Sequence, residues 1–206
     1  MTSHPKDLSD KLIQAFVDCE KLCKYIHLPV QAGSSRVLKR MNRKYDREKY
    51  LDLVRRLREA VPGITMSTDI IVGFPGETEE DFEETLSLVK EVGYDSAFTF
   101  LYSIRKGTPA AEYEDQIPED IKHERFNRLV DLINEGSAAK NAAYVGRIER
   151  VLVEGSSKKN DETLTGRTDG FKLVDFEGPK ELIGQIVEVE ITEGKTFSLA
   201  GRLAQK

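Results

Sequence analysis

Residues 68–78 read TDIIVGFPGET, and this stretch decides the fold of the chain. A short β-branched apolar run ends at Gly73, passes through a Pro-Gly turn and enters a segment that begins with the capping residue Thr78. This pattern is typical of a strand that ends at a ligand-binding edge of a parallel α/β sheet. The acidic residues that follow would repel a phosphate, so a nucleoside-like ligand without phosphates fits better. The alternative is an ordinary strand-to-helix turn with no ligand.

Short apolar strands alternate with amphipathic helices through about residue 135. The expected helices begin after Ser9, after Asp46, at Thr78 (ending near Gly93) and at about Glu119. The expected strands are Ile26–Gln31, Ile64–Val72 and Ala97–Tyr102. This alternation predicts parallel strands joined by right-handed crossovers, with functional groups at the carboxyl ends of the strands.

The helical period disappears after the polar stretch Asn134–Ala143. The residues beyond it predict about five short strands separated by glycine-containing turns: Arg147–Glu154, Thr163–Thr168, Phe171–Phe176, Gln185–Thr192 and Thr196–Leu203. Five such strands usually form a small OB-like barrel, which binds oligonucleotides in some proteins and is a structural appendage in others. We therefore expect an α/β domain over residues 1–140 and an all-β barrel over residues 143–206.

Composition indicates a soluble globular protein with one or two hydrophobic cores. The chain has 206 residues, of which 39% are hydrophobic and 33% charged. It contains no apolar run of membrane-spanning length and no secretory signal, so we expect a cytoplasmic protein without a membrane partner. The formal net charge of -5 argues against broad, charge-driven binding of nucleic acid, but a local basic face is still compatible with it.

The two cysteines, Cys19 and Cys23, have the C-x3-C spacing that begins the C-x3-C-x2-C cluster motif of radical SAM enzymes. The third position is Ile26, which cannot bind iron, and a [4Fe–4S] cluster needs several thiolate ligands. No cluster is therefore expected in this chain. We interpret both cysteines as small buried hydrophobic residues, which suits a reducing compartment.

Short motifs along the chain resemble, in the same order, those of the radical SAM methylthiotransferases. They are SHPKD at residues 3–7, IHLPVQAGS at 26–34, MNR at 41–43, TDIIVGFPGET at 68–78 and YSIRKGTP at 102–109. GRT at residues 166–168 and SLAG at 198–201 resemble the TRAM domain of the same family. The resemblance covers essentially the whole chain. It implies the C-terminal part of a radical SAM (β/α)6 partial TIM barrel, followed by a TRAM β-barrel.

The HLP motif and the Gly-Ser pair after Gln31 resemble the tRNA-modifying branch of this family. The resemblance implies methylthiolation at C2 of an N6-isopentenylated adenosine in the anticodon stem-loop of tRNA. It also implies S-adenosyl-L-methionine (SAM) and two [4Fe–4S] clusters as cofactors of the full-length enzyme. Two alternatives stay open. One is a non-catalytic RNA-binding module, and the other is a methylthiotransferase for threonylcarbamoyl-adenosine in tRNA or for a ribosomal protein.

The family's N-terminal cluster domain, its cysteine motif and its first two barrel strands have no counterpart in these residues. We therefore expect strands three to six of the barrel, no activity of this chain alone, and a natural partner in the missing N-terminal half. The incomplete barrel leaves an unpaired sheet edge, which loops or a second copy of the chain would cover.

The resemblance and the positions of the strand ends together imply a set of SAM-binding residues. Ile71, Gly73 and Phe74 are expected near the adenine or the ribose. Gln31 and Ser34 would bind the ribose or the methionine end, or would only cap the helix that begins at Ser35.

The same opening is expected to include Ser3, His4 and Tyr102, although His4 could equally be a polar rim residue. Candidates to bind the carboxylate of SAM or the phosphates of tRNA are Arg36, Arg43 and Arg105. The alternative for each arginine is a surface salt bridge. We assign no catalytic residue and no metal ligand within this chain.

The basic residues of the C-terminal domain are candidates for a phosphate-binding track. They are Arg147, Arg150, Lys158, Lys159, Arg167 and Lys172. Phe171 or Phe176 would offer a stacking surface for a base. Acidic and basic residues nearly balance in this domain, so RNA binding requires the basic residues to lie on one side.

Overall fold

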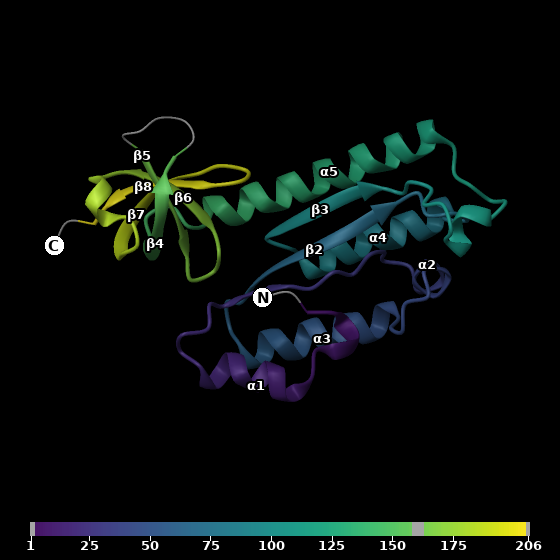
Figure 1. Cartoon of the computed structure of the whole chain (residues 1–206), viewed down its shortest axis with the longest axis horizontal. Coiled ribbons are helices and arrows are strands. Elements are labelled where there is room, and N and C mark those ends of the chain that lie inside the picture. The colour runs from purple at the N-terminus through teal and green to yellow at the C-terminus, as the bar shows by residue number, and fades with distance from the viewer. Residues whose placement is uncertain (1–2, 158–162, 205–206) are drawn as a thin grey trace. The chain divides into compact units, whose positions relative to one another are not determined.

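The structure, a computed structural model, describes residues 3–157 and 163–204. The predicted RNA-binding residues Lys158 and Lys159 lie outside the described residues. The chain divides into two compact units (Figure 1). The first contains the described part of Met1–Cys19 together with Ile26–Asn134, and the second contains Glu20–Tyr25 and the described part of Glu135–Lys206.

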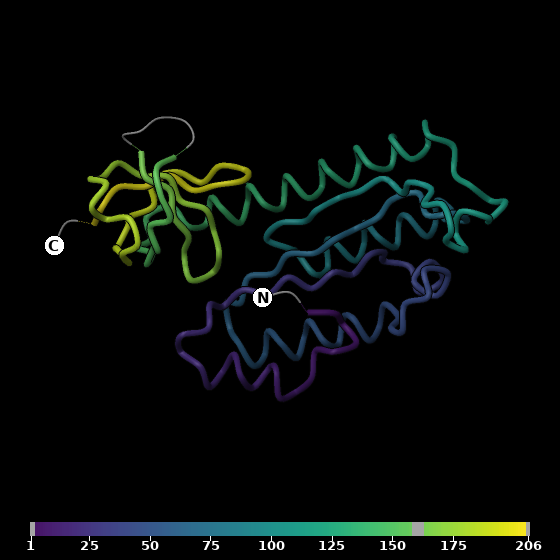
Figure 2. Tube along the Cα trace, in the orientation of Figure 1, coloured from purple at the N-terminus to yellow at the C-terminus, as the bar shows by residue number. Residues whose placement is uncertain are grey.

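The first unit is built on a three-stranded sheet with the order β1-β2-β3. Its strands are β1 (Tyr25–His27), β2 (Thr65–Val72) and β3 (Ser96–Leu101), and β2 runs parallel to β3. Strand β1 is short because Pro29 follows it and cannot donate a backbone hydrogen bond. The chain nevertheless continues beside β2 to a bridge between Gln31 and Ile70 (Figure 2), so three carboxyl ends lie together at one edge.

Three of the four expected strands are formed in the described part of the first unit, and the first of the four falls partly on residues 1 and 2, outside the described residues. The backbone N–H of Ser3 donates a hydrogen bond of 2.9 Å to the carbonyl oxygen of His27, as in the first step of a ladder. The chain then turns into the short helix η1 (Pro5–Asp7). Pro5 ends the pairing because it has no N–H to donate and its ring fixes φ in the helical range.

The helices of the first unit begin at the predicted capping residues. Ser9 caps α1 (Asp10–Asp18), Asp46 caps α3 (Arg47–Ala60), and Thr78 forms a capping box with Asp81 at the start of α4 (Glu79–Val92). Gly93 ends α4 with φ 54°, a left-handed conformation that glycine adopts at little cost. The remaining helices are α2 (Ser35–Arg40), η2 (Pro109–Glu112) and α5 (Glu119–Ala142).

The core of the first unit lies on one face of the sheet. Met66, Ile70 and Val72 of β2 are buried, and Phe82 and Leu88 of α4 are fully buried as well. On the alternate positions, Asp69 and Ile71 are only partly buried, and Phe98 and Phe100 of β3 are 58% and 50% exposed. The opposite face of the sheet is therefore much more open.

The second unit contains a closed five-stranded barrel with the strand order β4-β5-β6-β8-β7. Its strands are β4 (Ile148–Ser156), β5 (Thr163–Thr168), β6 (Leu173–Glu177), β7 (Ile186–Gly194) and β8 (Leu199–Leu203), with the short helix η3 (Lys180–Leu182) before β7. Strands β6 and β8 pair in parallel and the other neighbours pair antiparallel. The interior is filled by Val151, Val153, Leu164, Val174, Phe176, Val189, Ile191 and Leu199. The predicted small barrel is confirmed.

Helix α5 continues to Ala142, through nearly all of the polar stretch Asn134–Ala143, after which the sequence showed no helical period. The polar stretch contains four alanines, which favour helix, so it extends the helix. Two of its polar side chains, which belong to the second unit, have partners within that unit. Ser137 donates a hydrogen bond of 2.7 Å to the carbonyl oxygen of Thr196, and Asn141 donates one of 2.6 Å to that of Lys195. Among the described residues, no helix is both long and apolar enough to cross a membrane.

Candidate functional site

A cavity of about 690 Å³ opens at the carboxyl edge of the sheet in the first unit. Its walls come from the loop after β1, the end of α2, the ends of β2 and β3, and the loop that precedes α5. They consist of Gln31, Arg40, Met41, Asn42, Arg43, Asp69, Ile71, Phe74, Phe100, Leu101, Tyr102, Ser103, Arg105, Thr108, Pro109, Ala110 and Tyr113. This is the edge at which parallel α/β sheets bind ligands.

Gln31 enters this cavity with an unusual backbone conformation. Its φ is 73°, in the left-handed region that non-glycine residues rarely adopt. The backbone is held there because the N–H of Gln31 donates to the carbonyl oxygen of Asp69, and its own carbonyl oxygen accepts from the N–H of Ile71, both at 2.9 Å. Such strained residues cluster at ligand-binding and active sites.

Aromatic rings form one wall of the cavity. The ring of Phe74 meets the ring of Tyr102 edge to face at 5.2 Å and the ring of Tyr113 at 6.4 Å. The guanidinium of Arg40 lies 4.8 Å from the centre of the Tyr113 ring and makes two hydrogen bonds, of 2.8 and 2.9 Å, to the carboxylate of Asp115. The wall offers aromatic surface that can pack against a flat ligand.

Two buried polar atoms of the cavity residues have no hydrogen-bond partner among the described residues. They are the phenol oxygen of Tyr102 and Nε of Arg43. Buried polar groups are nearly always hydrogen-bonded, because an unpaired one loses its hydration without compensation. The two atoms are therefore suited to bind a polar ligand.

The cavity brings together six of the predicted cofactor-binding residues. They are Gln31, Arg43, Ile71, Phe74, Tyr102 and Arg105. These residues come from the segment after β1, the loop after α2 and the ends of β2 and β3, so their meeting at one cavity depends on the parallel sheet. The role of each residue in binding stays a prediction.

Two families have sequence models that match this chain. The Radical SAM superfamily matches residues 1–89, and the TRAM domain matches residues 142–204. A relative from Clostridium botulinum (strain Hall), named tRNA-2-methylthio-N(6)-dimethylallyladenosine synthase, is 66% identical over 201 residues. That match covers 98% of this chain and 45% of the relative. The chain is thus similar to radical SAM proteins over its first 89 residues and to TRAM domains over its last part.

A second relative with the same name, from Clostridium perfringens (strain SM101), is 58% identical over 205 residues and is covered to 46%. The chain therefore spans less than half the length of the curated methylthiotransferases it matches. Coproporphyrinogen III oxidase (HemN) from Escherichia coli, a radical SAM enzyme of known structure, matches 92% of this chain and 45% of its own with a TM-score of 0.56. At 14% identity this likeness shows the fold alone.

Gly73 and Ser34, two of the predicted cofactor-binding residues, do not line the cavity. Gly73 has φ 76°, and a Cβ there would lie 2.4 Å from Cγ of Lys122, so the glycine makes room for that side chain. The N–H of Gly73 donates to Oε1 of Glu77 at 3.1 Å. Ser34 is buried, and its hydroxyl donates to Oδ1 of Asp81 at 2.6 Å, so it stabilises the start of α4.

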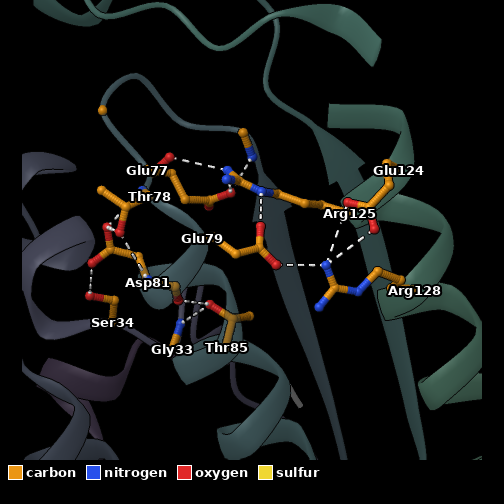
Figure 3. Close-up of polar contacts among 12 residues, drawn as sticks. Gly33, Ser34, Glu77, Thr78, Glu79, Asp81, Thr85, Glu124, Arg125 and Arg128 are labelled. Atoms are coloured by element: carbon orange, nitrogen blue, oxygen red, sulfur yellow. Dashed lines mark hydrogen bonds and ion pairs between the residues drawn. The ribbon is translucent and has the colours of Figure 1, made fainter. Parts of the chain in front are cut away.

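Arg36 pairs with the same carboxylate as Ser34 (the Asp81–Ser34 contact is drawn in Figure 3). Burial alone would raise the pKa of the Asp81 carboxyl. Hydrogen bonds from Arg36, Ser34 and Thr78 outweigh burial and hold that pKa well below its usual range. Arg36 thus forms the salt bridge that the sequence left open as an alternative.

Ser3 and His4 also lie away from the cavity lining. Ser3 is buried and pairs through its backbone with His27. Nδ1 of His4 accepts a hydrogen bond of 3.1 Å from the N–H of Lys6, and its ring meets that of Tyr45 edge to face at 5.6 Å. Because His4 caps η1, it has a local structural role in this unit.

A buried ion pair joins α5 to the loop that contains the cavity residue Phe74. Glu77 and Arg125 of α5 are almost fully buried, and Oε1 of Glu77 lies 3.1 Å from a terminal guanidinium nitrogen of Arg125 (Figure 3). Arg125 also pairs with Glu79 at 3.1 Å. Burial raises the pKa of Glu77 to about 7, although the N–H of Gly73 and the charge of Arg125 act in the opposite direction.

Lys122, one turn before Arg125, connects this ion pair to the cavity wall. It is buried, and its Nζ donates hydrogen bonds to the carbonyl oxygen of Tyr102 at 3.3 Å and to Oε1 of Glu119 at 2.7 Å. The same Nζ lies 5.7 Å from the centre of the Tyr102 ring. Sequence reasoning missed Lys122 and Arg125, because only the packing of α5 brings them to the ends of the strands.

Sequence reasoning also missed Asp69 and His27 on the open face of the sheet. Asp69 lines the cavity, and its Oδ1 lies 3.3 Å from Nε2 of His27. A signal was present, because Asp69 and Ile71 are two residues apart on a strand and must share a face.

The burial predicted for the cysteines is wrong, because Cys19 and Cys23 are both exposed and unpaired. They follow α1, in the connection to β1, where the chain runs over the surface. Within residues 3–157 and 163–204, no three or more His, Cys, Asp or Glu residues are grouped as a metal site would require.

The predicted basic track of the barrel is only partly exposed. The side chains of Arg147 and Arg150 are 57% and 63% exposed. Arg147 lies 3.2 Å from Glu149, and Arg150 lies 3.8 Å from Asp169. Each of these arginines therefore faces an acid that a phosphate would have to replace.

Arg167 and Lys172 each lie against an aromatic ring. Arg167 is paired with Glu154 at 3.3 Å, and its guanidinium lies 4.1 Å from the centre of the Phe171 ring. Lys172 is 8% exposed, so its predicted place in a surface track is wrong; it lies over the ring of Tyr144 at 5.8 Å.

Phe171 and Phe176, the two residues predicted to stack on a base, differ in their exposure. Phe176 is part of the barrel core, so it cannot offer a ring to a base. Inward and outward positions alternate along β6, and the side chain of Phe176 occupies an inward one. Phe171 is 44% exposed, and its ring stacks on that of Tyr25 at 4.4 Å. The exposed part of Phe171 is the aromatic surface that remains for this role.

Proposed function

We propose that this chain is the C-terminal part of an enzyme that methylthiolates C2 of N6-dimethylallyladenosine in tRNA. The observation that carries the proposal is the 66% identity to a tRNA-2-methylthio-N(6)-dimethylallyladenosine synthase over 98% of this chain. The chain covers 45% of that relative, so the rest of the activity would come from residues outside this chain.

The cavity has the chemistry to hold an adenosine-containing ligand. Phe74 and Tyr102 offer aromatic surface against which a base can pack, and Ile71 adds an apolar contact. Arg43 and Arg105 supply guanidinium groups suited to a carboxylate, and Nε of Arg43 has no partner among the described residues. SAM has both an adenosine and a carboxylate, so these residues fit it.

When bound together, SAM and an iron–sulfur cluster supply radical chemistry, which the side chains described above do not provide themselves. The residues of this chain would hold SAM, orient it and exclude water. Iron–sulfur clusters need cysteine thiolates. Among the described residues, no three or more His, Cys, Asp or Glu side chains are grouped so that they could hold a metal ion.

The barrel is proposed to bind the tRNA substrate outside the modified base. Arg147 and Arg150 are its most exposed candidates for contact with phosphates. A barrel that binds RNA without catalysis by the chain is the second candidate function. Self-association through the open sheet edge stays a prediction.

The proposal is tested with a chimera, in which this chain replaces the matching C-terminal residues of the Clostridium botulinum relative. The chimera is expressed in a strain that lacks the modification, and the tRNA is digested and analysed for the 2-methylthio nucleoside by mass spectrometry. We expect product with the chimera and none with the 206-residue chain alone. A soluble, folded chimera without product, beside an active parent enzyme, would contradict the proposed function.

The RNA-binding alternative predicts a different pattern in the same material. The 206-residue chain would then bind an anticodon stem-loop in a gel-shift assay, and the chimera would yield no product. Arg150→Ala is the matched variant, because its exposed side chain can be removed without opening the barrel core. It should weaken binding in the assay if the barrel contacts phosphates.

A further inference from the structure

A second hollow of the first unit lies between η1 and the first turns of α3, and its lining is rich in basic residues. Its volume is about 470 Å³. The lining consists of Pro5, Lys6, Lys44, Tyr45, Glu48, Lys49, Asp52, Leu53 and Arg56, and we call this hollow the basic groove. Basic residues outnumber acidic ones in it, although the formal net charge of the whole chain is -5. Such a local excess of one sign of charge attracts ligands of the opposite sign.

The lysines of the basic groove are available to a ligand. Lys6 and Lys44 are exposed and have no acidic partner among the described residues; Nζ of Lys44 donates a hydrogen bond of 2.8 Å to the neutral side-chain oxygen of Asn42. Nζ of Lys49 lies 3.7 Å from Asp46, and both of these side chains are largely exposed, so their pair contributes little stability. The three ammonium groups can therefore bind an anion without first breaking a strong ion pair.

The acidic side chains of the groove are engaged within the first unit. The carboxylate of Asp52 lies 2.6 Å from a guanidinium nitrogen of Arg55 and 3.8 Å from one of Arg56. Glu48 accepts a hydrogen bond of 3.2 Å from the hydroxyl of Ser35. The arginines compensate Asp52, so Glu48 is the acid that remains beside three lysines. The groove therefore keeps a positive charge.

One short loop joins the basic groove to the cavity. Asn42 and Arg43 line the cavity, whereas the next two residues, Lys44 and Tyr45, line the groove. Tyr45 is buried, and its phenol donates a hydrogen bond of 3.1 Å to the carbonyl oxygen of Val30, which anchors the loop. An extended polymer that brings one of its units to the cavity can therefore continue over this loop into the groove.

We propose that the basic groove binds the phosphodiester backbone of the RNA whose modified nucleoside is brought to the cavity. This inference rests on the proposed function, which gives the enzyme an RNA substrate. Each nucleotide carries one negative phosphate, and a lysine binds it as a point charge. Lys6, Lys44 and Lys49 come from η1, the loop and α3, so they are spread along the groove and suit a chain of phosphates better than a single one. Contacts of this kind position an RNA but do not read its sequence.

The test measures the fluorescence anisotropy of a labelled anticodon stem-loop RNA with the 206-residue chain, over a range of KCl concentrations. The variant Lys6→Ala/Lys44→Ala removes two exposed ammonium groups of the groove. For a single-stranded loop, each lost phosphate contact should reduce the slope of log affinity against log salt by about 0.7. Two lost contacts should weaken binding about 25-fold at about 0.1 M salt, and the difference should vanish towards about 1 M.

The matched control is Lys11→Ala/Lys90→Ala, which removes the same charge from two exposed lysines outside the groove and the cavity. It should leave the salt slope unchanged. Lys44→Arg keeps the positive charge and should bind the RNA like the unchanged chain, which separates the effect of charge from that of loop packing.

Equal weakening of RNA binding by the groove variant and the control would overturn the proposal. An unchanged RNA affinity of the groove variant would overturn it as well, even if inorganic phosphate bound the unchanged chain, because the groove would then serve a free phosphate. Both results leave the proposed function standing as long as the chimera described above yields the 2-methylthio nucleoside. A folded chimera without product contradicts the proposed function, whereas the salt slopes of the variants report on the groove alone.

Discussion

The substitution Glu77→Gln is expected to flatten the pH dependence of stability of the first unit. Glu77 is 4% exposed, and burial raises its pKa from 4.5 to about 7 despite the N–H of Gly73 and the charge of Arg125. The folded state therefore binds this proton more tightly than the unfolded state. The stabilisation is complete below the unfolded pKa of 4.5, and it is lost as the pH rises through about 7.

The size of this effect follows from the shift in pKa. One pKa unit corresponds to about 1.4 kcal/mol, so a rise from 4.5 to about 7 corresponds to roughly 3 kcal/mol between the protonated and ionised forms. Glutamine keeps the shape of the side chain and cannot titrate. The unchanged chain should lose this stability as the pH rises, whereas the variant should not. The free energy of unfolding of Glu77→Gln minus that of the unchanged chain should therefore increase by about 3 kcal/mol from about pH 5 to about pH 8.

The assay is urea unfolding followed by the helical circular dichroism signal, at several pH values between about pH 5 and about pH 8. A constant offset is expected as well, because Arg125 loses a buried partner in the variant. Only the slope tests the reasoning, since the offset does not depend on pH in this range.

The matched control is Glu79→Gln, which removes another partner of Arg125. Hydrogen bonding to Arg128 lowers the pKa of Glu79, so this carboxyl is ionised throughout the range and should not change the slope. Parallel curves for Glu77→Gln and the unchanged chain would refute the argument from burial.

Two further predictions concern packing. Gly33→Ala should destabilise the first unit by about 3 kcal/mol in urea unfolding, because the added Cβ would lie 2.3 Å from the backbone Cα of Thr85; normal stability would show that the loop can shift. Leu164→Ala should destabilise the barrel by about 2–5 kcal/mol in thermal unfolding, because this side chain is fully buried in its core. A change below about 1 kcal/mol would show that the barrel core collapses around the lost side chain.

Local signals in the sequence were sufficient to predict most of the elements. Ser9, Asp46 and Thr78 cap helices where the pattern placed them, because a cap depends on hydrogen bonds within a few residues. The barrel strands follow from alternation and glycine turns for the same reason. The contacts at the end of α5 were not predictable, since Ser137 and Asn141 bond to residues more than fifty positions away.

The candidate site was predictable where strand ends alone determine it. Gln31, Ile71 and Tyr102 line one cavity because parallel strands end at one edge. Ser34 has a suitable residue type and position, but the choice between a ligand and Asp81 depends on where α4 packs. The exposure of Cys19 was hidden for a related reason, since the sequence does not reveal which surface the loop after α1 follows.

The left-handed backbone of Gln31 has an evolutionary consequence. Glycine would adopt the same φ with a relief of roughly 1 kcal/mol, so folding alone gives no reason to keep a larger residue there. Glycine would, however, remove a side chain that lines the cavity. A lineage that retains glutamine at this position accepts a slightly weaker fold in exchange for a polar side chain at the cavity wall.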